Sequence, residues 1–211
     1  MVATGRSMDW KTEMHSNLWV FPKGMERNGE TGANSLKWTS KYGSVVTSAF
    51  EIASTDGMNE KGLVANLLWL PETEYPVRDQ SKPGLAITAW VQYMLDNFAT
   101  VDEAVASIDE NTFQVVSDLM PDGSRLATLH LSISDATGDC AIFEYTGGKL
   151  TVYHSKEYKV MTNSPTYNKQ LALNEYWKSI GGLSFLPGTN RPSDRFARAS
   201  FYINALPPTD D

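Results

Sequence analysis

Two charged residues near the start of the chain have side chains and a spacing that could bring a cation and a carboxylate together. Arg6 and Asp9 lie three residues apart. On an extended or turning backbone they can converge on one point, where the guanidinium pairs with an anion or donates hydrogen bonds and the carboxylate orients an amine. A surface ion pair has the same spacing, so these two residues alone do not define a site.

Two further polar residues lie in the C-terminal half. Asn163 follows an expected strand and precedes Ser164 and Pro165, where a side-chain amide can face a cleft. An Asx-turn or the entry to the next helix is the alternative for Asn163. Arg195 is followed three residues later by Arg198, and a solvated helix face explains that spacing equally well.

Tryptophans supply candidate apolar walls. Trp69 ends an apolar stretch just before Pro71, so it belongs either to the core or to the wall of an apolar pocket. Trp90 fits the apolar stripe of an expected helix and is assigned to packing. Trp10 directly follows Asp9, which places it beside the first polar pair.

Cysteine and histidine usage points away from metals and disulfides. Cys140 is the single cysteine, which excludes an internal disulfide and a Cys-rich zinc site. His15, His130 and His154 are scattered without metal-ligand spacing. Cys140 lies in an apolar strand with no His or Lys nearby in sequence, so we expect a small buried thiol rather than a nucleophile. We therefore expect no metal and no cofactor.

Composition narrows the class of protein. The 211 residues include 18 Lys+Arg and 25 Asp+Glu, giving a net charge of −7, which argues against a nucleic-acid binder. Hydrophobic residues make up 41% of the chain, enough for a sizeable core. No apolar run approaches the roughly 20 residues of a membrane helix, so no membrane association is expected.

Hydrophobic periodicity predicts strands in two blocks, with helices between and after them. The expected strands cover residues 44–52, 63–70, 126–134, 139–145, 150–154 and 158–162. The first of them is bounded by Gly43 and by an expected turn at Thr55, Asp56 and Gly57. The expected helices cover residues 85–98, 100–108 and 166–180, the second opening with a capping box formed by Thr100 and Glu103. Short connections predict largely antiparallel sheets with helices packed outside them, an α+β class.

Four motifs, taken together, resemble the choloylglycine hydrolase and penicillin V acylase family. They are residues 5–10, 56–63, 161–165 and 195–201, and their order and spacing are similar to that family's over essentially the whole chain. The resemblance implies an N-terminal-nucleophile (Ntn) hydrolase that cleaves a non-peptide C–N amide bond in a small molecule. It implies an αββα sandwich, with two largely antiparallel sheets between helical layers, as a single domain over residues 1–211.

The resemblance also implies residue roles. Arg6 matches an arginine beside the nucleophilic thiol, and Asp9 an aspartate that holds the α-amine. Asn163 matches an asparagine that helps to hold the oxyanion. Arg195 is similar to the second active-site arginine, with Arg198 as the weaker alternative.

For the acyl group the resemblance implies an aromatic pocket. Trp69 falls where relatives carry an Asn or Tyr, and the pair of Trp10 and Trp69 is similar to acylases of Gram-negative bacteria. Those acylases favour aromatic acyl groups or long-chain acyl-homoserine lactones. The resemblance also favours a homotetramer for the full-length parent and a periplasmic over a cytoplasmic location.

One part of the family pattern is not in this sequence. The family's nucleophile is a Cys at the first position of the processed chain, activated by its own α-amine, and it is expected upstream of Gly5. Both ends of the sequence are expected to be edges of something longer, with the C-terminal part of the fold beyond Asp211. We expect the chain to be inactive alone and its full-length parent to be active. A non-catalytic binding protein and an acid-ceramidase-like amidase are the alternatives.

Overall fold

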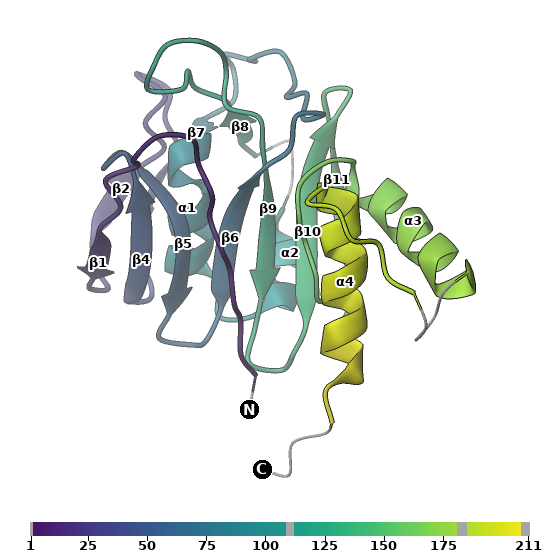
Figure 1. Ribbon diagram of the computed structural model, residues 1–211. Coiled ribbons are helices and arrows are strands. Elements are labelled where there is room, and N and C mark those ends of the chain that lie inside the picture. The colour runs from purple at the N-terminus through teal and green to yellow at the C-terminus, as the bar shows by residue number, and fades with distance from the viewer. Residues whose placement is uncertain (1, 109–111, 181–184, 208–211) are drawn as a thin grey trace.

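The computed structural model describes residues 2–108, 112–180 and 185–207 (Figure 1). Its centre is a seven-stranded antiparallel sheet with the order β1-β4-β5-β6-β9-β10-β11. These strands are β1 (Leu18–Phe21), β4 (Ser44–Ala49), β5 (Ala53–Asn59), β6 (Val64–Trp69), β9 (Leu129–Ser134), β10 (Cys140–Thr146) and β11 (Lys149–His154). Pairing of β6 with β9 joins the two predicted blocks of strands into one layer.

Smaller elements complete the described fold. β2 (Glu26–Asn28) pairs with β3 (Lys37–Thr39), and β7 (Gly84–Ala86) pairs in parallel with β8 (Gln114–Val116). The helices are η1 (Ile87–Ala89), α1 (Trp90–Asn97), α2 (Val101–Ser107), α3 (Tyr167–Ile180) and α4 (Pro192–Ala205). The predicted α+β class and antiparallel pairing are confirmed, and the described strands form one large sheet and two small pairs. None of the described helices has the length and apolar character to cross a membrane.

Different elements pack on the two faces of the large sheet. α1 and α2 lie behind it in Figure 1, while the N-terminal segment and α4 cross its front. The main core lies under α1, where Trp90, Met94 and Leu95 are fully buried against sheet residues such as Leu67 and Leu131. Alternation along each strand therefore leaves the front face for the N-terminal segment and the site.

Predictions of single elements that rested on a short stretch of sequence are confirmed. The Thr100 side chain accepts a hydrogen bond from the Glu103 backbone N–H, which confirms the predicted cap of α2. The strands β9 to β11 and the helix α3 lie within a few residues of their predicted bounds. Trp90 is in the core, as its position on the apolar stripe predicted.

Two predictions were wrong, one of a turn and one of the start of a helix. Asp56 and Gly57 lie inside β5 and not in a turn; the turn is at Phe50 and Glu51, which have φ angles of 54° and 60°. Gly57 serves close packing instead, because a Cβ there would lie 2.7 Å from the Leu95 side chain of α1. The predicted helix over 85–98 begins later, because residues 84–86 pair with β8 before the chain turns helical.

The predicted strand over residues 158–162 was also wrong. This segment belongs to no strand, and Tyr158, Val160 and Met161 pack against the small cluster of Ile142, Tyr167 and Phe196. Its apolar residues suggested a strand, but they cover the front of the sheet beside α4 rather than extending its edge.

Asn59 at the end of β5 joins the sheet to the end of α1. Its Nδ2 donates to the backbone O of Leu95 at 2.9 Å and of Phe98 at 2.7 Å, and its Oδ1 accepts from the N–H groups of Lys61 and Leu63 at 3.0 Å each. The residue is 3% exposed. Asn59 therefore satisfies helix carbonyls and turn N–H groups that water does not reach.

Replacing Asn59 by Ala is predicted to lower the free energy of unfolding by about 3 kcal/mol, because several buried backbone groups lose their partners at about 1 to 3 kcal/mol each. Urea unfolding followed by circular dichroism measures the change. Asn204→Ala, at an exposed position of α4, is the matched control and should stay within about 0.5 kcal/mol. Equal effects of the two substitutions would contradict the role given to Asn59.

Candidate functional site

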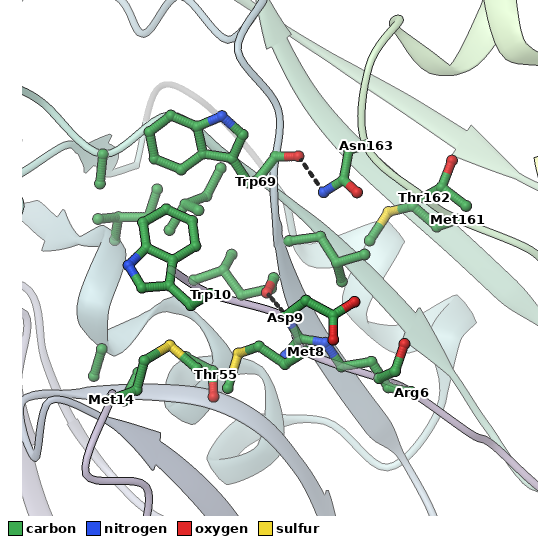
Figure 2. Close-up of a pocket in the computed structure, with 18 of the residues that line it drawn as sticks. Arg6, Met8, Asp9, Trp10, Met14, Thr55, Trp69, Met161, Thr162 and Asn163 are labelled. Carbon is green, nitrogen blue, oxygen red and sulfur yellow. Dashed lines mark hydrogen bonds between the residues drawn. The ribbon is translucent and has the colours of Figure 1, made fainter. Parts of the chain in front are cut away.

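A pocket of about 520 Å³ opens on the front face of the sheet, a volume within the range of small-molecule sites (Figure 2). The N-terminal segment, the ends of β5 and β6, residues 118–121, residues 159–163 and α4 form its walls. It brings together six of the residues singled out from the sequence: Arg6, Asp9, Trp10, Trp69, Asn163 and Arg195.

Arg6 attaches the N-terminal segment to the centre of the sheet. Its guanidinium forms an ion pair with Asp56 of β5 through Nη1, and its Nη2 donates to the Leu67 O of β6 at 3.0 Å. Asn66 Nδ2 donates to the other oxygen of Asp56 at 2.8 Å. The Arg6 and Asp56 side chains are only 16% and 18% exposed, so the alternative of a surface pair between Arg6 and Asp9 is wrong.

Asp9 lies at the exposed side of the pocket, three residues after Arg6. Because Arg6 is engaged by Asp56, the Asp9 carboxylate is left facing the pocket, where Figure 2 shows it between Arg6 and Asn163. A carboxylate in this place can accept hydrogen bonds from an ammonium group.

Asn163 is fixed by tertiary contacts at both ends of its amide. Its Nδ2 donates to the backbone O of Trp69 at 2.7 Å, and its Oδ1 accepts from Arg195 Nη2 at 2.7 Å. The side chain therefore contacts β6 and α4, which goes against the alternative of a local Asx-turn. Nδ2 carries a second proton, so the amide can hold an anionic oxygen in the pocket while keeping both contacts.

Arg195 projects from the first turns of α4 and is half-buried. Besides the Asn163 contact, its Nε donates to the Asn190 O at 3.2 Å. Arg198 points elsewhere: its Nη1 donates to the Pro187 O at 2.6 Å and to the Thr189 O at 2.8 Å, which secures the segment before α4. Of the two arginines, Arg195 is the one that lines the pocket.

Aromatic rings form the apolar wall. The Trp10 and Trp69 rings are tilted at 53° with centroids 5.6 Å apart, and the Arg125 guanidinium lies 4.2 Å from the Trp69 ring centroid on a neighbouring loop. Trp69 is half-buried and lines the pocket, which favours the pocket-wall interpretation over the core. Four methionines add a flexible apolar lining: Met8, Met14, Met120 and Met161.

Sequence reasoning missed Asp56 as a residue of this site. Asp56 lies within one of the four motifs but was placed in a turn, so its pairing with Arg6 was not foreseen. The available signal was a carboxylate in the middle of a sheet strand, which needs a partner when it is buried.

Cys140 lies outside this pocket. It begins β10, is a free and buried thiol, and burial together with nearby Asp139 raises its pKa to about 11. The expectation of a buried thiol is confirmed. A thiol with that pKa is almost entirely protonated at neutral pH and is a poor nucleophile.

Away from the pocket, two carboxylates and one imidazole, which are side chains of the kinds that bind metals, lie close together. His154 Nε2 lies 2.7 Å from Asp139 Oδ2 and 3.5 Å from Asp102 Oδ1, although the three residues are far apart in sequence. Asp102 is in the first turn of α2, and the other two residues belong to the β10–β11 region. These contacts connect α2 to the hairpin of β10 and β11.

The whole chain, residues 1–211, matches the family of linear amide C–N hydrolases called the choloylglycine hydrolase family. The chain is 56% identical over 212 residues to a penicillin V acylase from Pectobacterium atrosepticum, and the match covers 97% of this chain and 56% of that protein.

Solved structures give the same assignment. Penicillin V acylase from Agrobacterium tumefaciens superposes with a TM-score of 0.90 at 60% identity, over 98% of this chain and 62% of that one. Two variants of conjugated bile acid hydrolase from Clostridium perfringens superpose with TM-scores of 0.77 and 0.76 at 27% and 28% identity, over 94% of this chain and 67% of theirs. The chain thus spans only 56% and 62% of the length of the two penicillin V acylases.

These likenesses confirm the expected Ntn-hydrolase fold and the resemblance carried by the four motifs. The chain belongs to the choloylglycine hydrolase family of linear amide C–N hydrolases.

Proposed function

We propose that this chain supplies the acyl-binding and oxyanion-holding part of a penicillin V acylase-type amidase. The observation that carries the proposal is the Asn163 amide, held between the Trp69 O and Arg195 at the wall of an apolar pocket. Arg6 and Asp9 approach the same pocket from the N-terminal segment. The likeness to two penicillin V acylases at 56% and 60% identity supports the same activity.

The proposed reaction is acyl transfer through an N-terminal Cys that precedes the residues of this chain. Its α-amine, with an ordinary pKa of about 7.7 to 8.0, takes the thiol proton near neutral pH. The thiolate attacks the amide carbon, and the carbonyl oxygen becomes an oxyanion held by the second Nδ2 proton of Asn163. The α-amine then returns the proton to the leaving amine, and water hydrolyses the thioester to release the acid and restore the thiol.

Within this scheme Arg6 stands beside the thiol and Asp9 accepts hydrogen bonds from the α-amine. Both roles need the N-terminal segment on the front of the sheet, where the ion pair of Arg6 and Asp56 places it. Arg195 keeps the Asn163 carboxamide turned so that Nδ2, and not Oδ1, is presented to the oxyanion.

The pocket lining favours an aromatic or long apolar acyl group. Trp10 and Trp69 offer faces for an aryl ring, and the four methionines can adapt to a flexible chain. We therefore propose a phenoxyacetyl-type or acyl-homoserine lactone substrate in preference to a bile acid conjugate. A binding protein without catalysis is the alternative that the experiments below separate.

Full-length protein incubated with penicillin V is predicted to form a thioester adduct on an N-terminal Cys, detected by intact and peptide mass spectrometry. The 211-residue chain alone is predicted to form no adduct and to release no amine, because the raised pKa and burial of Cys140 keep that thiol unreactive. Amide hydrolysis by the 211-residue chain would contradict this prediction. Full-length protein that binds penicillin V without hydrolysis would favour the binding protein.

Asn163→Ala in the full-length protein is predicted to lower kcat about 10² to 10³-fold, because one oxyanion donor is lost. Release of the amine from penicillin V measures kcat, and circular dichroism checks that the variant is folded. Asn204→Ala, also an amide-to-methyl change but on the exposed side of α4, should leave kcat unchanged. Wild-type kcat in Asn163→Ala would remove Asn163 from the mechanism.

A further inference from the structure

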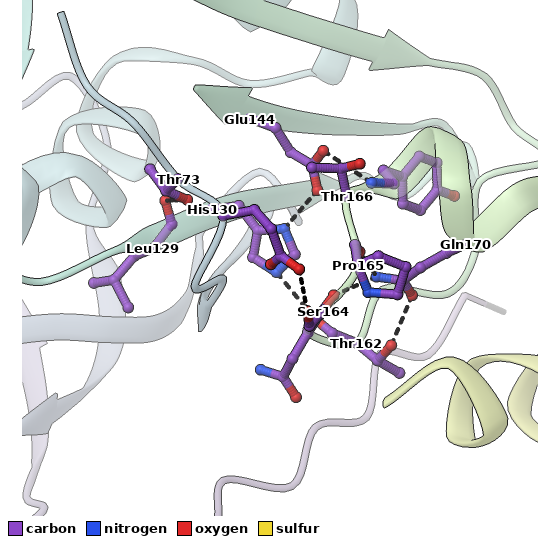
Figure 3. Close-up of polar contacts among 12 residues, drawn as sticks. Thr73, Leu129, His130, Glu144, Thr162, Ser164, Pro165, Thr166 and Gln170 are labelled. Carbon is purple, nitrogen blue, oxygen red and sulfur yellow. Dashed lines mark hydrogen bonds and ion pairs between the residues drawn. The ribbon is translucent and has the colours of Figure 1, made fainter. Parts of the chain in front are cut away.

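Behind Asn163 lies a fully buried polar cluster that the proposed reaction does not use (Figure 3). His130 of β9 and Glu144 of β10 are both 0% exposed, and His130 Nδ1 lies 2.8 Å from Glu144 Oε1. His130 Nε2 lies 2.9 Å from the backbone O of Thr162, and Glu144 Oε2 accepts from the Tyr167 N–H at 2.9 Å. The pair thus joins two strands of the sheet to the segment that carries Asn163 and to the start of α3.

The hydrogen-bond chemistry of this cluster is determined by its partners. A backbone carbonyl only accepts, so His130 Nε2 must carry a proton toward Thr162. The contact between Nδ1 and the Glu144 carboxyl requires one more proton, which the two groups share. The pair is therefore neutral overall, which is the arrangement that a site without solvent favours.

The Thr162 carbonyl is part of the peptide plane that precedes Asn163. The following plane is held as well, because Gln170 Nε2 donates to the Asn163 O and also to the Pro165 O at 2.6 Å. Thr162 Oγ1 in turn lies 2.7 Å from Gln170 Oε1. Both peptide planes around Asn163 are thus hydrogen-bonded to buried side chains, one to His130 and the other to Gln170.

We propose that His130, supported by Glu144, is a positioning residue that sets the backbone orientation of Asn163 and so aims its amide at the oxyanion. The inference rests on the oxyanion role proposed for Asn163. A displacement of about 1 Å at a reacting group can cost about 10²-fold in rate, so one buried hydrogen bond behind the site is enough to matter.

Two amide substitutions separate positioning from stability. The side-chain nitrogen of Asn stands one bond beyond Cγ, as Nδ1 does in His, whereas that of Gln stands two bonds beyond Cγ, as Nε2 does. His130→Asn therefore keeps a donor toward Glu144 and loses the bond to Thr162. His130→Gln keeps the bond to Thr162 and leaves a buried carboxyl oxygen unpaired, which makes it the less stable variant.

In full-length protein, His130→Asn is predicted to lower kcat for penicillin V about 10 to 100-fold with little change in KM. His130→Gln is predicted to retain most of kcat despite its lower unfolding temperature. A purely structural role predicts instead that kcat per folded molecule is equal in both variants, and that outcome would overturn the proposal. Asn59→Ala, a buried polar loss at another part of the sheet, is the control and should lower stability without lowering kcat per folded molecule.

A second readout uses the same full-length variants and does not depend on catalysis. The side-chain NH₂ signals of Asn163 can be assigned in ¹H–¹⁵N spectra by their loss in Asn163→Asp. These signals should move in His130→Asn and stay near their wild-type positions in His130→Gln and in Asn59→Ala. Unmoved signals in His130→Asn would overturn positioning by His130, whereas wild-type activity in Asn163→Ala with moved signals would overturn only the oxyanion role.

Discussion

The ion pair between Arg6 and Asp56 is the interaction on which the rest of the site depends. Residues 2–10 belong to no strand, and besides the bonds made by Arg6 they contact the sheet through a Thr4–Ser134 hydrogen bond and through the Trp10 ring against Trp69. The pair is largely shielded from water, and the same guanidinium also donates to a carbonyl of the neighbouring strand. Once Arg6 is fixed, Asp9 and Trp10 are within three and four residues of it and fall at the pocket.

The remaining walls are brought together by the pairing of β6 with β9. This pairing sets Trp69 opposite Leu129, and the next residue along β9 is His130. One face of the site is thus formed by the end of β6, while the buried support of Asn163 begins one residue further along its partner strand. Trp69 contributes twice, with its ring to the apolar wall and with its carbonyl to the orientation of Asn163. The proposed acyl-binding wall and the proposed oxyanion donor therefore share one residue, Trp69.

Much of this site could be predicted from sequence because its residues lie in short motifs. The strands β9 to β11 and the cap of α2 could also be predicted, because their sequence signals are local. The residues that these side chains contact in the folded structure could not be predicted. No feature of the sequence near Asp56 indicates that its partner is Arg6, fifty positions earlier. The Asp56-Gly57 pair is also typical of a turn, and only the structure shows that Gly57 is needed for close packing against Leu95. The segment 158–162 is apolar like a strand, but its backbone pairs with no strand: the N–H groups of Tyr158 and Lys159 donate to nearby backbone carbonyls, and the Thr162 O contacts the His130 side chain. Its place on the face of the sheet results from tertiary contacts, which the local sequence does not reveal.

The central claim is that the pair of Arg6 and Asp56 holds the N-terminal segment on the sheet. A double-mutant cycle with Arg6→Met, Asp56→Asn and the combined variant, followed by urea unfolding, tests it most directly. A shielded, charge-assisted contact predicts a coupling free energy of about 1.5 to 3 kcal/mol. Additive single effects, with a coupling energy near zero, would show that the two side chains do not hold the segment and would contradict the account.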